Sequence, residues 1–419
     1  MIVIVLLIFC VGVLSSLFIF QFEQNLMLRS YFGIVAVVVF LSACSDPKQV
    51  IDSPRVVNSS SELPIPLSDP KAILGSQLFF DTNLSKQRNQ SCGTCHDIAN
   101  AFVDKRQDAL SGAVSLGSDG HSMGGRNTPT AGYAAFSPAF YRMSNGEYRG
   151  GQFLDGRASG LAQQAEGPFL NPLEMALPDG ASVVERVKEN PRYIDLFNTL
   201  YGQDILEDAQ TGYAAITNAI ATFEKTALFM PFDSKYDRAL RGEAKLTPQE
   251  ELGKTLFFSQ QFTNCNACHQ LSTSPLNAQE TFTNYEYRNI GVPANPALMA
   301  FNGNKKDLGL LDNPVIDDPK QAGKFKVPSL RNVAVTGPYM HNGVFKDLRT
   351  VVLFYDKYNN PMRKLNPETG EPWAEPEVAE NIDLVNLEKG PALPDQRVDA
   401  IVAFLKTLTD QRYEPLLEK

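Results

Sequence analysis

Two short motifs contain the residue types in this chain that are best suited to chemistry. SCGTCH spans residues 91–96 and NCNACH spans residues 264–269. In the pattern Cys-x-x-Cys-His, two thiols can each form a thioether with one porphyrin, and the imidazole that follows can bind its iron. The sequence therefore predicts two covalently attached c-type haems. The attachment residues are Cys92, Cys95, His96, Cys265, Cys268 and His269, with His96 and His269 as the proximal iron ligands.

Zinc is the competing occupant of these motifs, because two Cys-x-x-Cys pairs could supply four thiolates. However, the pairs are separated by far more chain than a zinc ribbon uses, and a histidine follows each pair directly. The remaining cysteines, Cys10 and Cys44, lie in the N-terminal segment, which leaves no pair for a structural disulfide. We therefore assign both motifs to haem.

The same seven-residue unit stands before each haem motif, as LGSQLFF at residues 74–80 and as LGKTLFF at residues 252–258. Capping signals open both units, with S-D-P at residues 68–70 and T-P-Q-E at residues 247–250. A polar cap followed by proline is typical of the first turn of a helix. The repeat predicts two related halves, each with a short helix before its haem.

The apolar spacing inside these units indicates which helix faces are buried. Leu74 and Leu78 are four residues apart and should share one face, as should Leu252 and Leu256.

A last helical pattern closes the chain, where Val398, Ile401 and Leu405 follow three-four spacing. We expect this helix to pack on the second haem half. Residues 111–151 and 291–338 have short apolar runs and frequent Gly, Pro and Asn, which predicts long loops that are often functional. The predicted fold is mainly α, with two cytochrome c-like haem domains and long loops.

The length and charge of the chain limit how many domains it can have and which partners it can bind. A chain of 419 residues exceeds the usual size of one domain. We predict a signal or anchor segment at residues 1–44, a flexible tether at 45–66, an N-terminal haem domain at 67–240 and a C-terminal haem domain at 241–419. The net charge of −9 does not suit nucleic acid as a partner.

The N-terminal segment resembles the signal of a bacterial lipoprotein. Arg29 precedes the apolar residues 34–41, and L-S-A-C at residues 41–44 resembles a lipobox in which Cys44 is acylated. Translation could then start at Met27, while a plain transmembrane anchor is the alternative. Both interpretations place the rest of the chain outside the cytoplasm. The expected location is the periplasm, with a lipid anchor at Cys44.

Several segments in fixed order resemble the bacterial dihaem cytochrome c peroxidase and MauG family. After the first motif these are RNTPT at 126–130, FLDGR at 153–157, QQAEGP at 163–168 and Glu174-Met175; after the second they are VPSLRNV at 327–333 and TGPYMHNG at 336–343. The resemblance extends over nearly the whole chain that follows the tether. It implies that the His96 haem reacts with hydrogen peroxide and that the His269 haem relays electrons.

The resemblance also implies two residues on the peroxide side of the first haem. Gln164 and Glu174 match the family's distal glutamine and glutamate. Breaking the O–O bond heterolytically requires a group that moves a proton from the inner to the outer oxygen, and a carboxylate in a partly dry pocket can do so. Glu174 would be this acid–base catalyst, and Gln164 would orient peroxide or water.

A calcium ion between the haem domains is a further implication. Asn127, Thr336 and Pro338 match the family's ligands, which supply one side-chain oxygen and two backbone carbonyls. Ligation by oxygen alone suits calcium. The alternative is ordinary turn chemistry in the Asn-Thr-Pro and Thr-Gly-Pro segments.

The sixth iron ligands are a separate question. Tyr355 stands where the family's peroxidases have methionine and its MauG-like members have tyrosine, and Met340 and Met362 are the alternatives. A phenolate favours higher oxidation states of iron, whereas methionine raises the potential. His121 is the histidine available as a distal ligand of the resting first haem, unless it is merely an exposed loop residue.

Two departures from the family pattern concern tryptophan. Leu154 stands where both relatives have a tryptophan between the haems, and Thr263 replaces the tryptophan that precedes the second motif in MauG. The one tryptophan of the chain, Trp373, lies in a Pro- and Glu-rich insertion.

The family resemblance leads to three functional hypotheses. The first is a peroxidase (EC 1.11.1.-) that reduces hydrogen peroxide with electrons from a small cytochrome c or cupredoxin. The second is a MauG-like enzyme that uses high-valent haem iron to oxidise side chains of a partner protein. The third is a non-catalytic dihaem electron carrier, against which Glu174 and Gln164 argue. Homodimerisation is usual in the family's peroxidases and is an expectation here.

Overall fold

A computed structural model describes residues 64–107, 110–272 and 277–418. The predicted lipobox at residues 41–44 and the alternative start at Met27 lie outside these ranges, as does almost all of the predicted tether. None of the helices in the described ranges combines the length and the apolar content that a membrane span needs.

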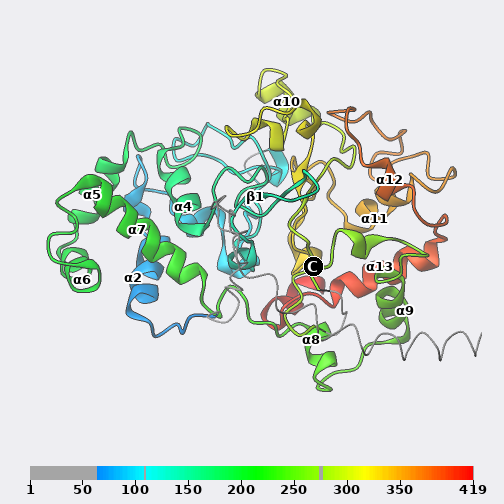
Figure 1. The fold of residues 1–419 in the computed structure, drawn as a ribbon, viewed down its shortest axis with the longest axis horizontal. Helices are drawn as coiled ribbons and strands as arrows, with labels where there is room; N and C mark the ends of the chain where they lie inside the picture. The colour runs from blue at the N-terminus through cyan, green and yellow to red at the C-terminus, as the bar shows by residue number, and fades with distance from the viewer. Residues whose placement is uncertain (1–63, 108–109, 273–276, 419) are drawn as a thin grey trace, which may run out of the picture. The chain divides into compact units, whose positions relative to one another are not determined.

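Helices dominate the described structure, as predicted (Figure 1). They are α2 (Pro70–Phe79), α3 (Cys92–Cys95), α4 (Leu161–Leu170), α5 (Gly180–Lys188), α6 (Pro191–Tyr201), α7 (Ala209–Glu224), α8 (Lys235–Leu240), α9 (Pro248–Phe257), α10 (Pro296–Phe301), α11 (Leu348–Asp356), α12 (Leu384–Leu387) and α13 (Asp395–Lys406). The loops contain short 3-10 helices. The last of them, Gln411–Glu418, ends the described chain.

The described residues contain four short strands in two antiparallel pairs, and three of these strands lie within the predicted long loops. Strand β1 (Tyr141–Arg142) pairs with β2 (Tyr148–Arg149), and β3 (Tyr287–Arg288) pairs with β4 (Phe325–Lys326). Each strand has only two residues, which is too short for the alternation of polar and apolar side chains that predicts a strand from sequence.

The predicted helix starts before both haem motifs are confirmed. The side chain of Asp69 accepts hydrogen bonds from the amides of Lys71 and Ala72 at the start of α2. At the start of α9, Thr247 and Glu250 form a reciprocal capping box.

A glycine in each repeat lets two helices approach closely. A Cβ atom on Gly75 of α2 would lie 1.9 Å from the carbonyl oxygen of Ala219 on α7. A Cβ atom on Gly253 of α9 would lie 1.9 Å from the carbonyl oxygen of Ala400 on α13. The two halves therefore repeat one helix pair, in which only glycine fits at the crossing.

The buried faces follow the prediction except at one position. Leu74, Leu78 and Leu256 are buried, whereas Leu252 is 38% exposed. Helix α9 turns Gly253, Leu256 and its C-terminal phenylalanine toward α13, and this rotation leaves Leu252 at the edge of the contact.

The chain forms two large hydrophobic cores. One is built from side chains between Leu74 and Met230, and the other from side chains between Tyr236 and Leu408. Cys92 packs against the first core and Cys265 against the second. Helix α13 packs on α9 in the second core, as predicted. The domain boundary between residues 240 and 241 stays a prediction.

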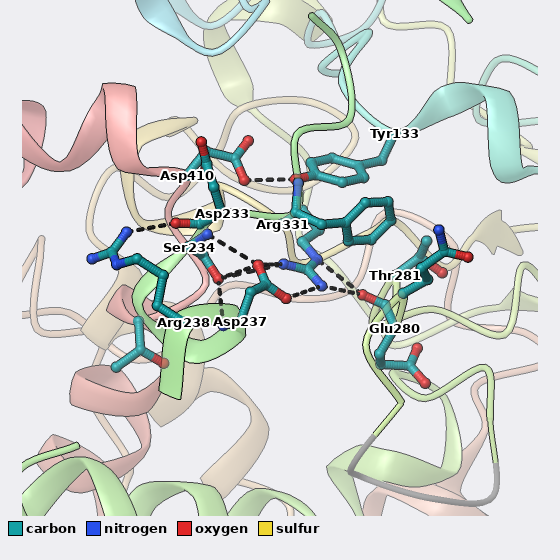
Figure 2. Close-up of polar contacts among 12 residues, drawn as sticks. Tyr133, Asp233, Ser234, Asp237, Arg238, Glu280, Thr281, Arg331 and Asp410 are labelled. Atoms are coloured by element: carbon teal, nitrogen blue, oxygen red, sulfur yellow. Dashed lines mark hydrogen bonds and ion pairs between the residues drawn. The ribbon is translucent and has the colours of Figure 1, made fainter. Parts of the chain in front are cut away.

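A buried polar cluster joins the N-terminal and C-terminal halves (Figure 2). The side chain of Arg331 is fully buried and forms an ion pair with Asp237 of α8. Arg331 also donates two hydrogen bonds to the carbonyl oxygen of Glu280, at 2.7 and 2.9 Å. Nearby, the hydroxyl of Tyr133 donates to Asp410 at 2.6 Å. Residues from both halves of the chain thus meet at one buried site.

Candidate active site and haem attachment sites

The first haem motif begins at α3 and presents a fixed histidine. The Nδ1 atom of His96 lies 3.1 Å from the carbonyl oxygen of Phe102. A carbonyl can only accept, so Nδ1 must be the protonated nitrogen and Nε2 is left with its lone pair. Burial lowers the pKa of His96, which keeps the ring neutral. The residue is therefore oriented as an iron ligand.

The second motif repeats this arrangement. The Nδ1 atom of His269 lies 3.1 Å from the carbonyl oxygen of Phe282. Burial lowers the pKa of His269 to about 4, so its imidazole is also neutral at pH 7. Each half thus supplies a backbone carbonyl to Nδ1 of its histidine, and the carbonyl of Pro328 also acts on the His269 ring.

A cavity of about 400 Å³ adjoins the second motif, within the size range of cofactor sites. Its walls include Cys265, Cys268, His269, Tyr355, Leu154 and Thr263. The cysteines of both motifs are half-buried and free, and burial raises the pKa of Cys265 to about 11. Neutral histidines beside half-buried thiols fit a c-type haem. The two cysteine pairs pack against different cores, which does not suit a shared zinc ion.

Tyr355 lies on α11 and faces the second motif. Its side chain lines the cavity, and burial raises its pKa, with Cys268 and Cys265 adding to this effect. Met340 also lines the cavity, whereas Met362 is 83% exposed and is not part of the lining. The structure therefore brings Tyr355 and Met340, but not Met362, to the second haem site.

Gln164 lies on α4, and Glu174 follows four residues after the end of this helix. The backbone of Glu174 is fixed by a hydrogen bond from its amide to the carbonyl of Asn171, at 3.0 Å. Burial raises the pKa of Glu174, while a hydrogen bond to Asn171 and the charge of Arg157 oppose this rise. The carboxylate in turn raises the pKa of Cys92, which places Glu174 in the electrostatic surroundings of the first attachment site.

Gln164 is half-buried on α4. Its side-chain amide forms no hydrogen bond with another described residue. A free amide at this position could bond a bound molecule or water.

The three predicted calcium ligands line the same cavity. The amide of Asn127 donates to the carbonyl of His341 at 2.7 Å, so the first loop lies beside the loop that contains Thr336 and Pro338. The ammonium group of Lys105 donates to the carbonyl oxygen of Gly337 in this loop. The region is thus rich in carbonyl oxygens, and a cationic side chain already contacts one of them.

His121 lies in an exposed loop. Asp119 accepts hydrogen bonds from the backbone amides of His121 and Ser122, at 2.9 and 2.8 Å. The structure therefore shows His121 as a solvated loop residue, and ligation of the first haem by His121 stays a prediction.

Sequence reasoning missed several residues near the sites. Glu224, at the end of α7, is buried, and burial raises its pKa to about 8. Glu224 also raises the pKa of Cys92, so it lies near the first haem attachment site. Trp373, remote in sequence, packs on Phe354 beside Tyr355, with ring centroids 5.6 Å apart. No local pattern marks either residue, because only the tertiary fold brings them to the sites.

The described fold and sites define a class of protein: a mainly helical chain with two Cys-x-x-Cys-His motifs of the c-type cytochrome kind, a histidine ring nitrogen bonded to a carbonyl in each, and a half-buried carboxyl group near the first motif. Comparison with known proteins agrees with this class. The family model for di-haem cytochrome c peroxidase matches residues 69–245.

Individual relatives narrow the class to a family. The chain is 55% identical over 359 residues to "Methylamine utilization protein MauG" of Paracoccus denitrificans, covering 84% of this chain and 92% of that protein. It is 31% identical over 361 residues to "Cytochrome c peroxidase Ccp" of Escherichia coli, covering 84% of this chain and 61% of that protein. The crystal structure of the diheme peroxidase BthA from Burkholderia thailandensis superposes with a TM-score of 0.74 at 31% identity, over 84% of this chain and 88% of that one. The chain belongs to the di-haem cytochrome c peroxidase and MauG family. It is a peroxidase-type oxidoreductase.

Proposed function

We propose that the chain is a periplasmic enzyme in which hydrogen peroxide reacts at the His96 haem and electrons pass through the His269 haem. The observation that supports this proposal best is the half-buried carboxyl group of Glu174 in the surroundings of Cys92. When bound, the haem would supply an iron that binds peroxide and exchanges electrons. In the full reduction, one hydrogen peroxide, two protons and two electrons give two water molecules.

Glu174 would act as the acid–base catalyst that transfers the proton during cleavage of the O–O bond of peroxide. Because burial raises its pKa, the carboxyl group can accept and release a proton at less cost than an exposed glutamate. It would take the proton from the inner oxygen and deliver it to the outer oxygen, which then leaves as water. Gln164, with its free amide on α4, would hold the peroxide or the departing water in place.

The source of the electrons separates two versions of this function. In the first, a small reduced cytochrome c or cupredoxin supplies them, and the result is peroxide reduction. In the second, they come from oxidisable side chains of a partner protein. Tyr355 in the cavity of the second motif favours the second version, because a phenolate ligand stabilises higher oxidation states of iron. The likeness to the MauG protein of Paracoccus denitrificans points the same way. A non-catalytic electron carrier would leave the half-buried Glu174 without a role.

We also propose the finer features that the sequence predicted. Asn127, Thr336 and Pro338 would hold one calcium ion, supported by their shared position on the cavity wall. Acylation of Cys44 would anchor the chain to the membrane, and two chains would form a homodimer. Dialysis against a calcium chelator, lipid analysis of the purified protein and sedimentation velocity test these three features separately.

The test of the main proposal is a rapid-mixing experiment. The fully oxidised protein is mixed with one equivalent of hydrogen peroxide, and the haem absorbance is followed for the wild type and for Glu174→Gln. Loss of a positioned acid–base group lowers the rate by roughly 10²–10⁴-fold. Glu185→Gln, which changes an exposed glutamate on α5, is the matched control and should react like the wild type. Equal rates for wild type and Glu174→Gln would remove Glu174 from the mechanism.

A further inference from the structure

Arg157 lies beside the helix that contains Gln164. Its guanidinium carbon is 3.6 Å from the centre of the Phe153 ring. The Phe153 ring in turn packs on α4, where a Cβ atom built on Gly167 would lie 3.3 Å from its tip. Gly167 and Gln164 are one turn apart on α4, so they share a face. The stacked pair of Phe153 and Arg157 therefore borders the proposed peroxide site.

The position of Arg157 is set by a buried carboxylate. One oxygen of Asp155 accepts from Arg157 at 2.7 Å and from Arg126 at 2.7 Å. The side chain of Asp155 is only 3% exposed and that of Arg126 is 19% exposed, whereas Arg157 is 39% exposed. Asp155 therefore fixes the position of Arg157, while solvent screens part of the Arg157 charge.

Arg126 extends this arrangement into the C-terminal half. It forms two hydrogen bonds with the carboxylate of Asp307. The amide of Asp307 donates to Glu377 at 2.8 Å, and both acidic residues line the cavity of the second haem motif. We call the series Arg157, Asp155, Arg126 and Asp307 the ion-pair chain. It runs from the peroxide side of the first haem to the wall of the second haem site.

Few charged groups act on Glu174. Arg157 is the one cation among the described residues that lowers the pKa of Glu174. Asn171 contributes a hydrogen bond, and the thiol of Cys92 loses its acidity once the thioether forms. Glu224 acts on Cys92 from α7, and burial keeps its carboxyl group mostly protonated at pH 7.

We propose that Arg157 is a positioning residue of the peroxide site, which balances the charge of Glu174 and is itself held in place by the ion-pair chain from the C-terminal half. This inference rests on the proposed function of Glu174. A fixed cation favours the ionised form of a nearby carboxyl group. Arg157 would therefore stabilise Glu174 at the moments of the reaction when it has no proton.

The inference is tested by the pH profile of the peroxide reaction, measured by rapid mixing with hydrogen peroxide on the haem-loaded protein. The rate should rise with pH as Glu174 ionises. Arg157→Gln should shift the midpoint of this rise upward by less than about one pH unit, because the opposing charge is lost but solvent already screens part of it. Arg157→Lys should restore most of the wild-type midpoint. Arg126→Gln should give a smaller upward shift, since Asp155 then loses one of its two cations and holds Arg157 less firmly in place.

Arg142→Gln is the matched control, because Arg142 also lies over an aromatic ring, that of Tyr148, but in the exposed β1–β2 hairpin. It should keep the wild-type midpoint. Haem content and the melting temperature of each variant report its folding. Asp155 retains Arg126 in Arg157→Gln, so this variant should fold.

The outcomes separate the two proposals. A wild type that does not react with peroxide, whether oxidised or reduced by one electron, overturns the proposed function. A wild type that reacts with a clear pH midpoint, together with an unshifted midpoint in Arg157→Gln and in Arg126→Gln, overturns the role of Arg157 alone.

Discussion

At the scale of single residues, two backbone carbonyls set the chemistry of both haem sites. The carbonyls of Phe102 and Phe282 each lie 3.1 Å from Nδ1 of a proximal histidine. The acceptor fixes the tautomer and the ring orientation, so Nε2 of His96 and of His269 would be the nitrogen that binds a haem iron. The attachment residues stay a prediction, which rests on the fixed spacing that covalent haem binding demands. The carbonyl acceptors were not predictable from the sequence, because they lie on loops whose course the motif does not determine.

Tyr355 should set the potential of the second haem. Tyr355→Met replaces a phenol with a thioether, which favours the reduced state and should raise the midpoint potential of this haem. Spectroelectrochemical titration measures the change. Tyr358→Phe is the control on the same segment, because the Tyr358 hydroxyl donates to the carbonyl of Ile290, at 2.9 Å, and does not line the cavity. An unchanged potential in Tyr355→Met would assign the sixth position to another residue, with Met340 the first to test.

Glu224 should make stability depend on pH. Burial raises its pKa from 4.5 to about 8, so folding favours the protonated acid. Its contribution is fully present below pH 4.5, and it is lost as the pH rises through about 8. Glu224→Gln cannot ionise, so relative to this variant the wild type should lose stability from pH 5 to pH 8, on the order of 3 kcal/mol at pH 7.

Thermal unfolding of both proteins at pH 5 and pH 8 measures this effect. Glu185→Gln, an exposed change on α5, should follow the wild type at both pH values. If the gap between wild type and Glu224→Gln stays constant with pH, then Glu224 is ionised in the folded protein.

At the scale of elements, the repeated glycine explains why the two halves use the same helix pair. Gly75 brings α2 onto α7, and Gly253 brings α9 onto α13. The sequence repeat predicted the first helix of each pair and the C-terminal helix. It did not identify the glycine as the contact point, because the partner carbonyls of Ala219 and Ala400 are far away in the chain.

Gly253→Ala should therefore destabilise the second half. The added methyl group would lie 1.9 Å from the carbonyl oxygen of Ala400, so α9 and α13 must move apart. Overpacking of this kind costs about 1–3 kcal/mol. Denaturant unfolding measures the loss, and Gly160→Ala is the control because a Cβ atom there meets nothing within 4 Å. Equal stability of Gly253→Ala and wild type would show that the crossing can open freely.

In the predicted loops, sequence patterns do not predict where the backbone lies in the fold. Residues 111–151 contain the β1–β2 hairpin, whose Gly150 amide donates to the carbonyl of Tyr285 at 2.9 Å. Its position follows from contacts with the C-terminal half and not from local spacing. The same holds for Arg157, which the sequence marked only as part of a family motif.

At the scale of the whole described chain, the buried cluster around Arg331 links the two halves. Its guanidinium carbon lies 4.8 Å from the ring centre of Phe232 and 5.3 Å from that of Tyr133, and it pairs with Asp237 (Figure 2). The cluster also holds the Glu280 carbonyl, two residues before the carbonyl that binds His269. The junction of the halves thus supports the second haem site.

Arg331→Met should be strongly destabilising, because it leaves Asp237 buried without its partner. Breaking a buried ion pair from one side costs about 3–5 kcal/mol. The double variant Arg331→Met/Asp237→Leu should recover part of this loss, since no unpaired charge remains. Denaturant unfolding measures all three proteins. Arg241→Met, which breaks the exposed Arg241–Glu243 pair, is the control and should cost less than about 1 kcal/mol. A double variant no more stable than Arg331→Met would mean that packing, and not charge, dominates the site.

The most direct test of peroxide chemistry at the His96 haem is low-temperature electron paramagnetic resonance of the haem-loaded protein before and after one equivalent of hydrogen peroxide. The arrangement of His96, Glu174 and Tyr355 predicts two distinct ferric signals, a high-spin signal from the first haem and a low-spin signal from the second. Both signals should decrease within the mixing time after peroxide is added. Two low-spin signals that persist with peroxide, in the oxidised protein and after reduction by one electron, would contradict a peroxide-reactive site at His96.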